Sequence, residues 1–330
     1  MRFLSRSEMA RAMTMSEAVE IVRKAYAQLS TGLAAVPART VLSVERHAGI
    51  TLVMPGLLRG EEAMAVKIVS VHRGNPAAGL PLIHGLVIVL DPATGRPLAA
   101  MEGGWLTALR TGAGSGVATD LLARPDAATL AIFGAGGQAR TQALGVAAVR
   151  PLRRCSIHAP RAAQVAALME TLRADLGEEI ELCAAASPAE AVREADIVCT
   201  ATTSATPVFD GADLKPGAHI NAVGAFQPHT REVDARTLQR ASKLVVDAME
   251  GAMAEAGDLL LALDEGAITH DRLYGEIGEI AAGRKPGRES DDEITFFKSV
   301  GNAAQDIATA AAIARRARDL DLGIELDLEA

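Results

Sequence analysis

Hydrophobic residues near the N-terminus recur every three or four positions, which predicts an amphipathic helix. The stripe consists of Ala18, Ile21, Val22, Ala25, Tyr26 and Leu29. Ser7 is expected to cap a shorter helical turn that precedes it. Short apolar runs bounded by glycine and proline then predict β-strands, at residues 39–44, 50–55, 65–71, 85–90 and 97–101. Residues 1–105 therefore mix helix with antiparallel strands.

The pattern changes near residue 106, where short apolar strands begin to alternate with helical segments. The expected strands are 129–133, 154–158, 180–183, 197–201, 219–223 and 243–247, and the expected helices are 106–122, 134–148, 162–176 and 187–194. This alternation is typical of a parallel sheet covered by helices on both faces. A later Ala-rich helix, 302–318, is expected to pack back against the N-terminal part.

We therefore predict an α/β protein with two domains. Residues 116–301 are expected to form a Rossmann-type, doubly wound parallel sheet. Residues 1–115 together with 302–330 are expected to form a discontinuous α+β domain.

A glycine-rich turn follows the strand predicted at residues 129–133. Its residues, Gly134, Ala135, Gly136, Gly137, Gln138 and Ala139, match the G-x-G-x-x-A dinucleotide fingerprint. The first glycine permits the tight turn, and the second lets the backbone approach a pyrophosphate. The small residue at the third position allows close helix–strand packing, and the helix N-terminus favours phosphate charge. The sequence therefore predicts a binding site for NAD or NADP.

The end of the second predicted strand should distinguish these two cofactors. Residues 157–161 carry no carboxylate to bind the ribose 2′-hydroxyl of NAD. His158 and Arg161 can contact a 2′-phosphate, which favours NADP(H). An exposed Arg161 that only begins a helix is an equally good interpretation, so NAD(H) stays open. Further cofactor contacts are expected where later strands end: Thr200, Ala201, Thr202, Val223 and Gly224.

The composition excludes several other classes of protein. The formal net charge of −8 and an aromatic content of 3% argue against nucleic-acid binding. The chain contains no continuous apolar run long enough to cross a membrane and no signal-peptide core at its start. Cys155, Cys183 and Cys199 show no metal-ligand spacing, and no metal is expected. We expect a soluble cytoplasmic protein.

Several motifs occur in an order that resembles the ornithine cyclodeaminase/mu-crystallin family over nearly the whole chain. They are Pro37-Ala38-Arg39, Met54-Pro55-Gly56, Val66-Lys67, Leu90-Asp91-Pro92-Ala93-Thr94-Gly95, Ala108-Leu109-Arg110-Thr111, the glycine-rich turn, Ile220-Asn221-Ala222-Val223-Gly224 and Phe297-Lys298-Ser299-Val300-Gly301-Asn302. The family includes ornithine and lysine cyclodeaminases, an alanine dehydrogenase branch and reductases of cyclic ketimines.

The resemblance implies a homodimer formed through the non-Rossmann domain, which would also bind the substrate. It implies that Arg39, Lys67 and Arg110 surround a substrate carboxylate, which agrees with the bidentate binding that arginine offers. Lys67 is either a further carboxylate contact or the proton donor to the imine. Other residues expected to contact the substrate or the cofactor are Met54, Phe226, Thr111 and Gly301.

Two departures from the family pattern point to one branch. The cyclodeaminases carry an Asp where Phe226 stands and a Glu where Leu52 stands, so amine oxidation loses its expected carboxylates. The segment 224–232 and Phe297-Lys298-Ser299 resemble the ketimine reductases. The resemblance thus implies NAD(P)H-dependent reduction of Δ1-pyrroline-2-carboxylate or Δ1-piperideine-2-carboxylate to proline or pipecolate.

Two alternatives stay open at this point. One is an ornithine cyclodeaminase or amino-acid dehydrogenase that uses NAD. The other is a protein that binds NADPH and a small ligand without turnover. Among other polar residues, His84 is more simply structural, and Glu232 and Asp234 are expected to cap a helix near Ala235.

Overall fold

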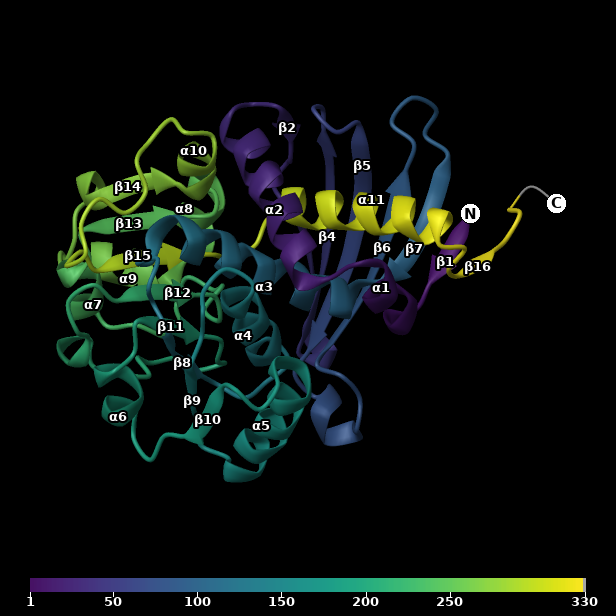
Figure 1. The fold of residues 1–330 in the computed structure, drawn as a ribbon. Helices are drawn as coiled ribbons and strands as arrows, with labels where there is room; N and C mark the ends of the chain where they lie inside the picture. Colours follow the sequence, from purple (N-terminus) through teal and green to yellow (C-terminus); the bar gives the residue numbers. More distant parts are fainter. Residues whose placement is uncertain (329–330) are drawn as a thin grey trace. The chain divides into compact units, whose positions relative to one another are not determined.

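The computed structural model describes residues 1–328, which fall into two compact units. Unit 1 comprises residues 1–110 and the chain from residue 302 onward, and unit 2 comprises residues 111–301 (Figure 1). The first boundary lies inside helix α3 (Gly103–Leu122), between Arg110 and Thr111, whereas the sequence placed it between residues 115 and 116.

Unit 1 is built on a mixed β-sheet with the strand order β16-β1-β7-β6-β5-β4-β2, and β3 pairs with β4. Its strands are β1 Arg2–Leu4, β2 Ala34–Ala35, β3 Thr40–Val44, β4 Gly49–Leu58, β5 Ala63–His72, β6 Ile83–Leu90, β7 Pro97–Glu102 and β16 Ile324–Glu325. Neighbours are antiparallel except β1 and β7, which are parallel. The predicted antiparallel strands correspond to β3–β7. The other three are too short to give a periodic pattern.

Helices α1 (Arg6–Ala12), α2 (Met15–Ser30) and α11 (Ala303–Asp319) belong to unit 1, together with the short 3-10 turns η1 (Glu45–His47) and η2 (Asn75–Ala78). The prediction that Ser7 caps the first helix is wrong. Ser5 is the N-cap, because Glu8 three residues later completes a capping box with it. In Figure 1, α11 runs across strands β4–β6, which it contacts.

The pleat of the sheet decides which side chains meet α11. On β5 the buried residues are Ala63, Ala65, Lys67 and Val69, which alternate with more exposed ones. Helix α11 approaches β4 closely at Gly56, where an added Cβ would lie 2.5 Å from Cδ1 of Ile307. Lys67 is therefore a charged residue on the buried face of a sheet.

Unit 2 contains an all-parallel sheet with the strand order β10-β9-β8-β11-β12-β15-β13-β14. Its strands are β8 Thr129–Phe133, β9 Arg154–His158, β10 Glu181–Ala184, β11 Ile197–Thr200, β12 His219–Ala222, β13 Lys243–Val246, β14 Leu273–Glu276 and β15 Thr295–Lys298. The first three strands build outward from β8, and the chain then returns to the other side of β8. This confirms the predicted Rossmann-type fold, to which β14 and β15 add two strands.

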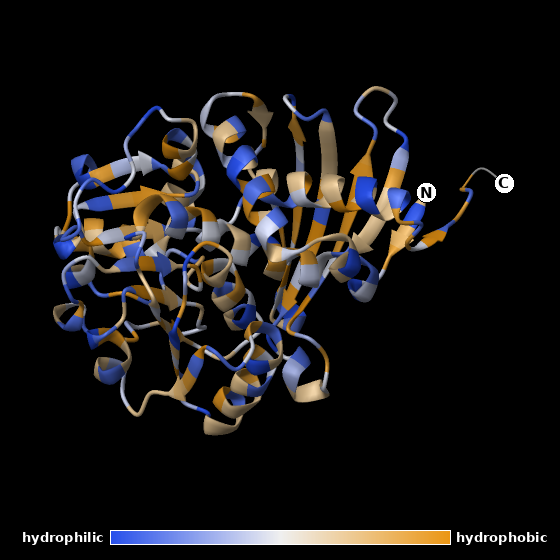
Figure 2. Ribbon diagram, in the orientation of Figure 1, coloured by the Kyte–Doolittle hydropathy of each residue, from blue (hydrophilic) through white to orange (hydrophobic). Residues whose placement is uncertain are grey.

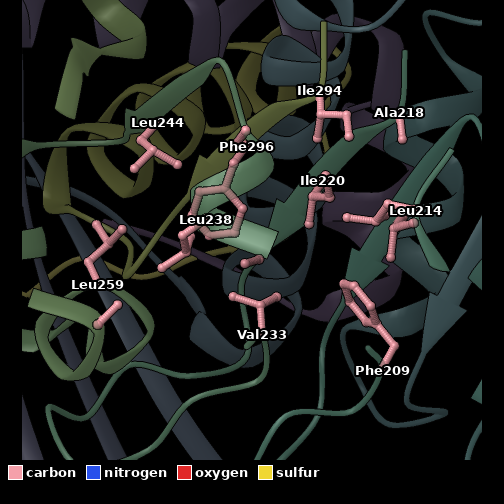
Figure 3. Close-up of a cluster of buried hydrophobic side chains, with 14 of the residues drawn as sticks. Phe209, Leu214, Ala218, Ile220, Val233, Leu238, Leu244, Leu259, Ile294 and Phe296 are labelled. Carbon is pink, nitrogen blue, oxygen red and sulfur yellow. The ribbon is translucent and has the colours of Figure 1, made fainter. Parts of the chain in front are cut away.

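Helices flank this sheet, and alternate strand residues pack into two apolar clusters. The helices that begin in unit 2 are α4 Ala139–Ala147, α5 Ala162–Leu176, α6 Pro188–Arg193, α7 Ala235–Arg240, α8 Met249–Glu255, α9 Gly257–Asp264 and α10 Ile277–Ala281, with 3-10 turns η3 Gly211–Asp213 and η4 His270–Arg272. Leu130 belongs to one cluster and Phe133 to the other. Figure 2 shows the hydrophobic residues running along the strands, and Figure 3 shows the cluster around Phe209, Ile220 and Phe296.

Candidate active site

The glycine-rich turn after β8 has the geometry that a pyrophosphate requires. Gly134 has a φ of 101°, a left-handed value that favours glycine, and its N–H donates to the carbonyl oxygen of His158 at 2.9 Å. A Cβ added at Gly136 or Gly137 would meet no atom within 4 Å, so a ligand can approach this backbone. Helix α4 begins directly afterwards at Ala139, which is fully buried. The turn therefore fits a dinucleotide phosphate.

Helix α4 is held close to the part of α3 that lies in unit 2. A Cβ at Gly145 would lie 2.0 Å from the carbonyl oxygen of Gly112, so only a glycine permits this approach. Thr111, an expected cofactor contact, is nearly buried at the preceding position. Gln138 carries a buried side-chain oxygen for which the described residues supply no hydrogen-bond partner.

The two residues expected to distinguish the cofactors have local partners. Nδ1 of His158 lies 3.2 Å from the carbonyl oxygen of Ala185, and its ring centroid lies 5.9 Å from that of Phe133. Arg161 is exposed, and its Nε donates to Oε1 of Gln164 at 2.9 Å. The preference for NADP(H) stays a prediction.

The residues after β11 and β12 meet at a carboxylate that the sequence had not connected with them. Glu232 is completely buried, and it accepts hydrogen bonds from Oγ1 of Thr200 and from the backbone of Thr202 and Gly224. Burial raises its pKa above the ordinary value, and Lys298 opposes this shift. The prediction that Glu232 caps a helix is therefore wrong. Asp234 alone caps α7, by accepting from the backbone N–H of Thr237.

The remaining expected cofactor contacts follow strands β11, β12 and β15. Ala201 donates its N–H to the carbonyl oxygen of Phe133, and Val223 donates to that of Thr200. Gly301 has a φ of 78°, and its N–H donates to the carboxylate of Asp247 at 2.8 Å. Asp247, which the sequence did not indicate, is itself almost fully buried.

In unit 1, two of the three predicted cations lie on opposite sides of one carboxylate. Nζ of Lys67 lies 2.8 Å from Oδ2 of Asp306, and Nε of Arg110 lies 3.0 Å from Oδ1. Side-chain exposure is 2% for Lys67, 8% for Arg110 and 1% for Asp306. Arg39 is partly buried and near enough for its charge to lower the pKa of Lys67. Two positive charges against one negative charge leave the buried cluster net positive.

Burial has opposite consequences for the two kinds of ionised group in this cluster. It lowers the pKa of Lys67 to about 8, although Asp306 opposes that shift. It also disfavours the ionised form of Asp306, but Arg110 and Lys67 outweigh it and hold the pKa of this carboxyl below its ordinary value. Asp306 is thus an anion that keeps two buried cations in place.

Further residues orient Arg110. Its Nη1 donates to Oε1 of Gln305 at 3.1 Å, and Nε2 of Gln305 in turn donates to the hydroxyl of Tyr26 at 2.8 Å. The sequence analysis did not identify Asp306 or Gln305. The sequence feature that indicates them is their position as adjacent polar residues within an Ala-rich helix.

The other two predicted substrate contacts have different positions. Met54 is the cross-strand neighbour of Lys67 on β4, and it is 5% exposed on the same face. Phe226 belongs to unit 2, on the segment after β12, and it is 39% exposed. His84 is exposed on β6.

The described part of the chain contains no group of three or more His, Cys, Asp or Glu side chains arranged to hold a metal ion. Among residues 1–328, none of the helices combines the length and the hydropathy that crossing a lipid bilayer requires.

Comparison with known proteins places this site in a family. A model of the ornithine cyclodeaminase/mu-crystallin family matches residues 1–321. The chain belongs to this family. Its resemblance to the family, predicted from ordered motifs, is thereby confirmed.

Members of the ornithine cyclodeaminase/mu-crystallin family resemble the chain along its whole length. Δ1-Pyrroline-2-carboxylate reductase of Bacillus cereus is 38% identical over 327 residues, which cover 99% of this chain and 100% of that protein. The structure of the Thermococcus litoralis enzyme of the same name, in complex with NADH and L-proline, is 41% identical with a TM-score of 0.95 and covers 99% of this chain and 100% of that one. An archaeal alanine dehydrogenase dimer with bound NAD is 34% identical with a TM-score of 0.91, covering 99% of each chain.

Proposed function

We propose that this chain is an NAD(P)H-dependent reductase of a small cyclic ketimine carboxylate. The substrate is Δ1-pyrroline-2-carboxylate or its six-membered homologue Δ1-piperideine-2-carboxylate, and the product is L-proline or L-pipecolate. The observation that carries the proposal is the buried, net positive cluster of Lys67, Arg110 and Asp306, which suits a single carboxylate. The similarity to reductases of this substrate over the full chain supports it.

The hydrogen bonds of the cluster leave donors for a substrate carboxylate. Asp306 and Gln305 engage Nε and Nη1 of Arg110, so Nη2 can bind the ligand. Lys67 has three N–H donors, and its partners are Asp306 at 2.8 Å and Thr107 at 3.4 Å. The third donor of Lys67 can therefore reach the carboxylate or the imine nitrogen. Because the cations are already fixed, binding orients the substrate with little further loss of conformational freedom.

The proposed chemistry is a balanced two-electron reduction. When bound, a reduced nicotinamide would supply the hydride that C2 of the imine receives, and one proton would go to the ring nitrogen. Lys67 either donates that proton or holds the carboxylate while an already protonated imine reacts. Amine oxidation with ring closure is disfavoured, because Leu52 and Phe226 stand where cyclodeaminases carry carboxylates.

The preference for NADP(H) over NAD(H) is a finer part of the proposal. Residues 157–161 carry no carboxylate for the ribose 2′-hydroxyl of NAD, whereas His158 and Arg161 offer donors to a 2′-phosphate. Relatives with bound NADH or NAD show that the family also uses the cofactor without this phosphate.

We also propose that the chain forms a homodimer through the face of the unit 1 sheet that lies opposite α11. Val53, Ile68 and Leu86 are cross-strand neighbours there, and Ile68 and Leu86 are 37% and 42% exposed. A related archaeal alanine dehydrogenase is a dimer. Light scattering of Ile68→Lys should show a monomer, whereas Leu320→Lys, which alters an exposed leucine outside this face, should stay dimeric. A dimeric Ile68→Lys variant would overturn this assignment.

The experiment that tests the function follows reduced-nicotinamide absorbance. The purified chain is mixed with NADPH or NADH and with each ketimine in turn. Rapid oxidation that depends on the ketimine is expected. Absence of oxidation with either ring and either cofactor would contradict the proposal, and ammonia release from L-ornithine or pyruvate formation from L-alanine would then identify the alternative.

A further inference from the structure

One buried carboxylate connects the ends of two adjacent strands in unit 2. Oε1 of Glu232 accepts the backbone N–H of Thr202 at 2.6 Å. Its Oε2 accepts those of Gly224 at 2.7 Å and Ala225 at 3.1 Å, and also the hydroxyl of Thr200 at 3.0 Å. We call residues 200–202 the β11 loop and residues 223–225 the β12 loop. The two carboxylate oxygens therefore accept backbone N–H groups from different loops, and Oε2 also binds the Thr200 hydroxyl of the β11 loop.

These loops are packed closely against their neighbours. A Cβ at Gly224 would lie 2.5 Å from both carboxylate oxygens of Glu232, so the β12 loop lies directly against this group. A Cβ at Gly134 would lie 2.7 Å from the carbonyl oxygen of Ala201. The β11 loop is thus in contact with the first glycine of the turn.

A second layer of contacts fixes Glu232 itself. Oδ1 of Asp258 accepts the backbone N–H groups of Glu232 and Val233 at 2.6 and 3.1 Å. Its Oδ2 binds Nζ of Lys298 at 2.5 Å, and both of those side chains are completely buried. Val233 and Leu259, the neighbours of these two acids in the chain, lie in the apolar cluster of Figure 3. The ion pair of Asp258 and Lys298 is therefore shielded from water.

The strand order indicates which part of the dinucleotide these loops would serve. In a doubly wound sheet the pyrophosphate lies at the turn after β8, and the adenosine ribose lies at the end of β9. Strands β11 and β12 lie on the other side of β8 from β9. The nicotinamide half therefore extends over the β11 and β12 loops.

We propose that Glu232 is a positioning residue for the nicotinamide half of the cofactor, acting through the β11 and β12 loops. The proposal rests on the proposed function only in that a dinucleotide binds to unit 2. It goes beyond that function because Glu232 uses all its hydrogen bonds within the protein and touches neither cofactor nor substrate in this account.

The substitution Glu232→Gln gives a sharp test because it keeps the size of the side chain. A glutamine has one acceptor oxygen and one NH₂ donor, whereas both oxygens of Glu232 accept backbone N–H groups. In either orientation of the amide, its NH₂ group faces the backbone N–H groups of one loop. The hydrogen bonds to that loop are then lost. An unmade hydrogen bond of a buried group weakens an interaction by about tenfold or more. We therefore expect Glu232→Gln to lower the affinity of the chain for NADH by about tenfold or more.

The matched control is Asp196→Asn. Asp196 is also buried, and its Oδ2 accepts the backbone N–H groups of Ala128 and Thr129 at 2.9 and 3.0 Å. It precedes β11 and therefore lies at the opposite end of the same sheet from the two loops. This variant should unfold at a lower temperature but retain the NADH affinity of the unaltered chain within about twofold, as expected for a distant site.

The experiment measures by calorimetry how the full chain and both variants bind NADH and, separately, ADP, which lacks the nicotinamide half. The expected result for Glu232→Gln is weakened binding of NADH with nearly unchanged binding of ADP. Equal weakening of both ligands would indicate a merely structural role and overturn the proposal, as would unchanged binding of NADH. If the unaltered chain binds NADH but reduces no ketimine, the proposed function fails while this test still decides the role of Glu232. An unaltered chain that binds no NADH overturns both.

Discussion

Lys67 and Asp306 form an ion pair of 2.8 Å between residues that are 239 positions apart in the chain. Both side chains are almost completely buried, and the same carboxylate binds Arg110 on its other oxygen. The last long helix of the chain therefore completes a site whose cations come from β5 and α3. Removal of a buried carboxylate that lies between two cations is strongly destabilising, because it leaves the buried positive charges without compensation.

Asp306→Asn should destabilise the protein and lower its activity. The neutral amide leaves Lys67 and Arg110 mutually repulsive, so we expect the free energy of unfolding to fall by about 3 kcal/mol. Because Asp306 raises the pKa of Lys67, the pKa of this lysine should fall further in the variant. Urea denaturation measures the first effect. Asp321→Asn, which alters a carboxylate 96% exposed in its pair with Arg2, is the control and should unfold as the unaltered chain does. Equal stability of the two variants would contradict this role of Asp306.

Arg110→Met should reduce kcat/KM for the ketimine by about 10²-fold or more, because a charged contact of about 3 kcal/mol is lost. The variant keeps a long apolar side chain, and its fraction folded is measured alongside its kinetics. Arg59→Met, which alters an exposed arginine whose Nη1 donates to the carbonyl oxygen of Gly32, should leave kcat/KM unchanged. Near-normal turnover by folded Arg110→Met would contradict the assignment of Arg110 as a contact of the substrate carboxylate.

The lowered pKa of Lys67 predicts an alkaline limb in the pH dependence of kcat/KM. The folded protein loses the Lys67 proton near pH 8, and with it either the carboxylate contact or the proton donor. Lys67→Arg keeps its charge throughout this range, so the limb that belongs to Lys67 should disappear. A limb that arises from titration of the imine itself would remain in both proteins. An unchanged profile in Lys67→Arg would therefore contradict the role of Lys67.

The same shift predicts how stability depends on pH. The pKa of Lys67 is about 8 in the folded chain, against an ordinary value of 10.5. Between these values the unfolded chain binds the proton and the native chain does not, so the free energy of unfolding increases with pH. Below about pH 8 both states carry the proton, and the full penalty of the buried charge remains. Relative to Lys67→Met, stability should rise by about 3 kcal/mol across this window.

Arg161→Ala tests the predicted preference for NADP(H). Loss of a contact to the 2′-phosphate should raise KM for NADPH by about tenfold, while KM for NADH should change little because NADH lacks this phosphate. Parallel steady-state assays with both cofactors on the same preparation provide the comparison. Equal changes for the two cofactors would indicate that Arg161 only begins α5.

Features that follow from local sequence could be predicted, and the structure shows the tight turn between β8 and α4 at Gly134, whereas the cofactor contacts of this turn stay a prediction. Gly134 and Gly136 are recognisable because a tight turn between a strand and a helix requires glycine at fixed spacing. The apolar runs of β8 to β13 predicted the parallel sheet, because strands buried on both faces carry continuous hydrophobic residues. The N-cap is Ser5 and not Ser7, because Glu8 stands three residues after Ser5 and completes the capping box with it.

Asp306 and Glu232 could not be assigned from the sequence for a different reason. Acidic residues are usually exposed, and neither spacing nor periodicity shows that these two are buried. Their partners come from distant parts of the chain: Asp306 binds Lys67 on β5, and Glu232 binds Thr202 across 30 positions. Only tertiary structure brings such donors together.

The most direct test of the account follows the hydride itself. The chain is incubated with NADH deuterated at C4 and with Δ1-pyrroline-2-carboxylate, and the proline formed is analysed by NMR and mass spectrometry. The account predicts L-proline that carries one deuterium at Cα, transferred from one face of the nicotinamide. Proline without deuterium at Cα, or no proline at all, would contradict the proposed reduction.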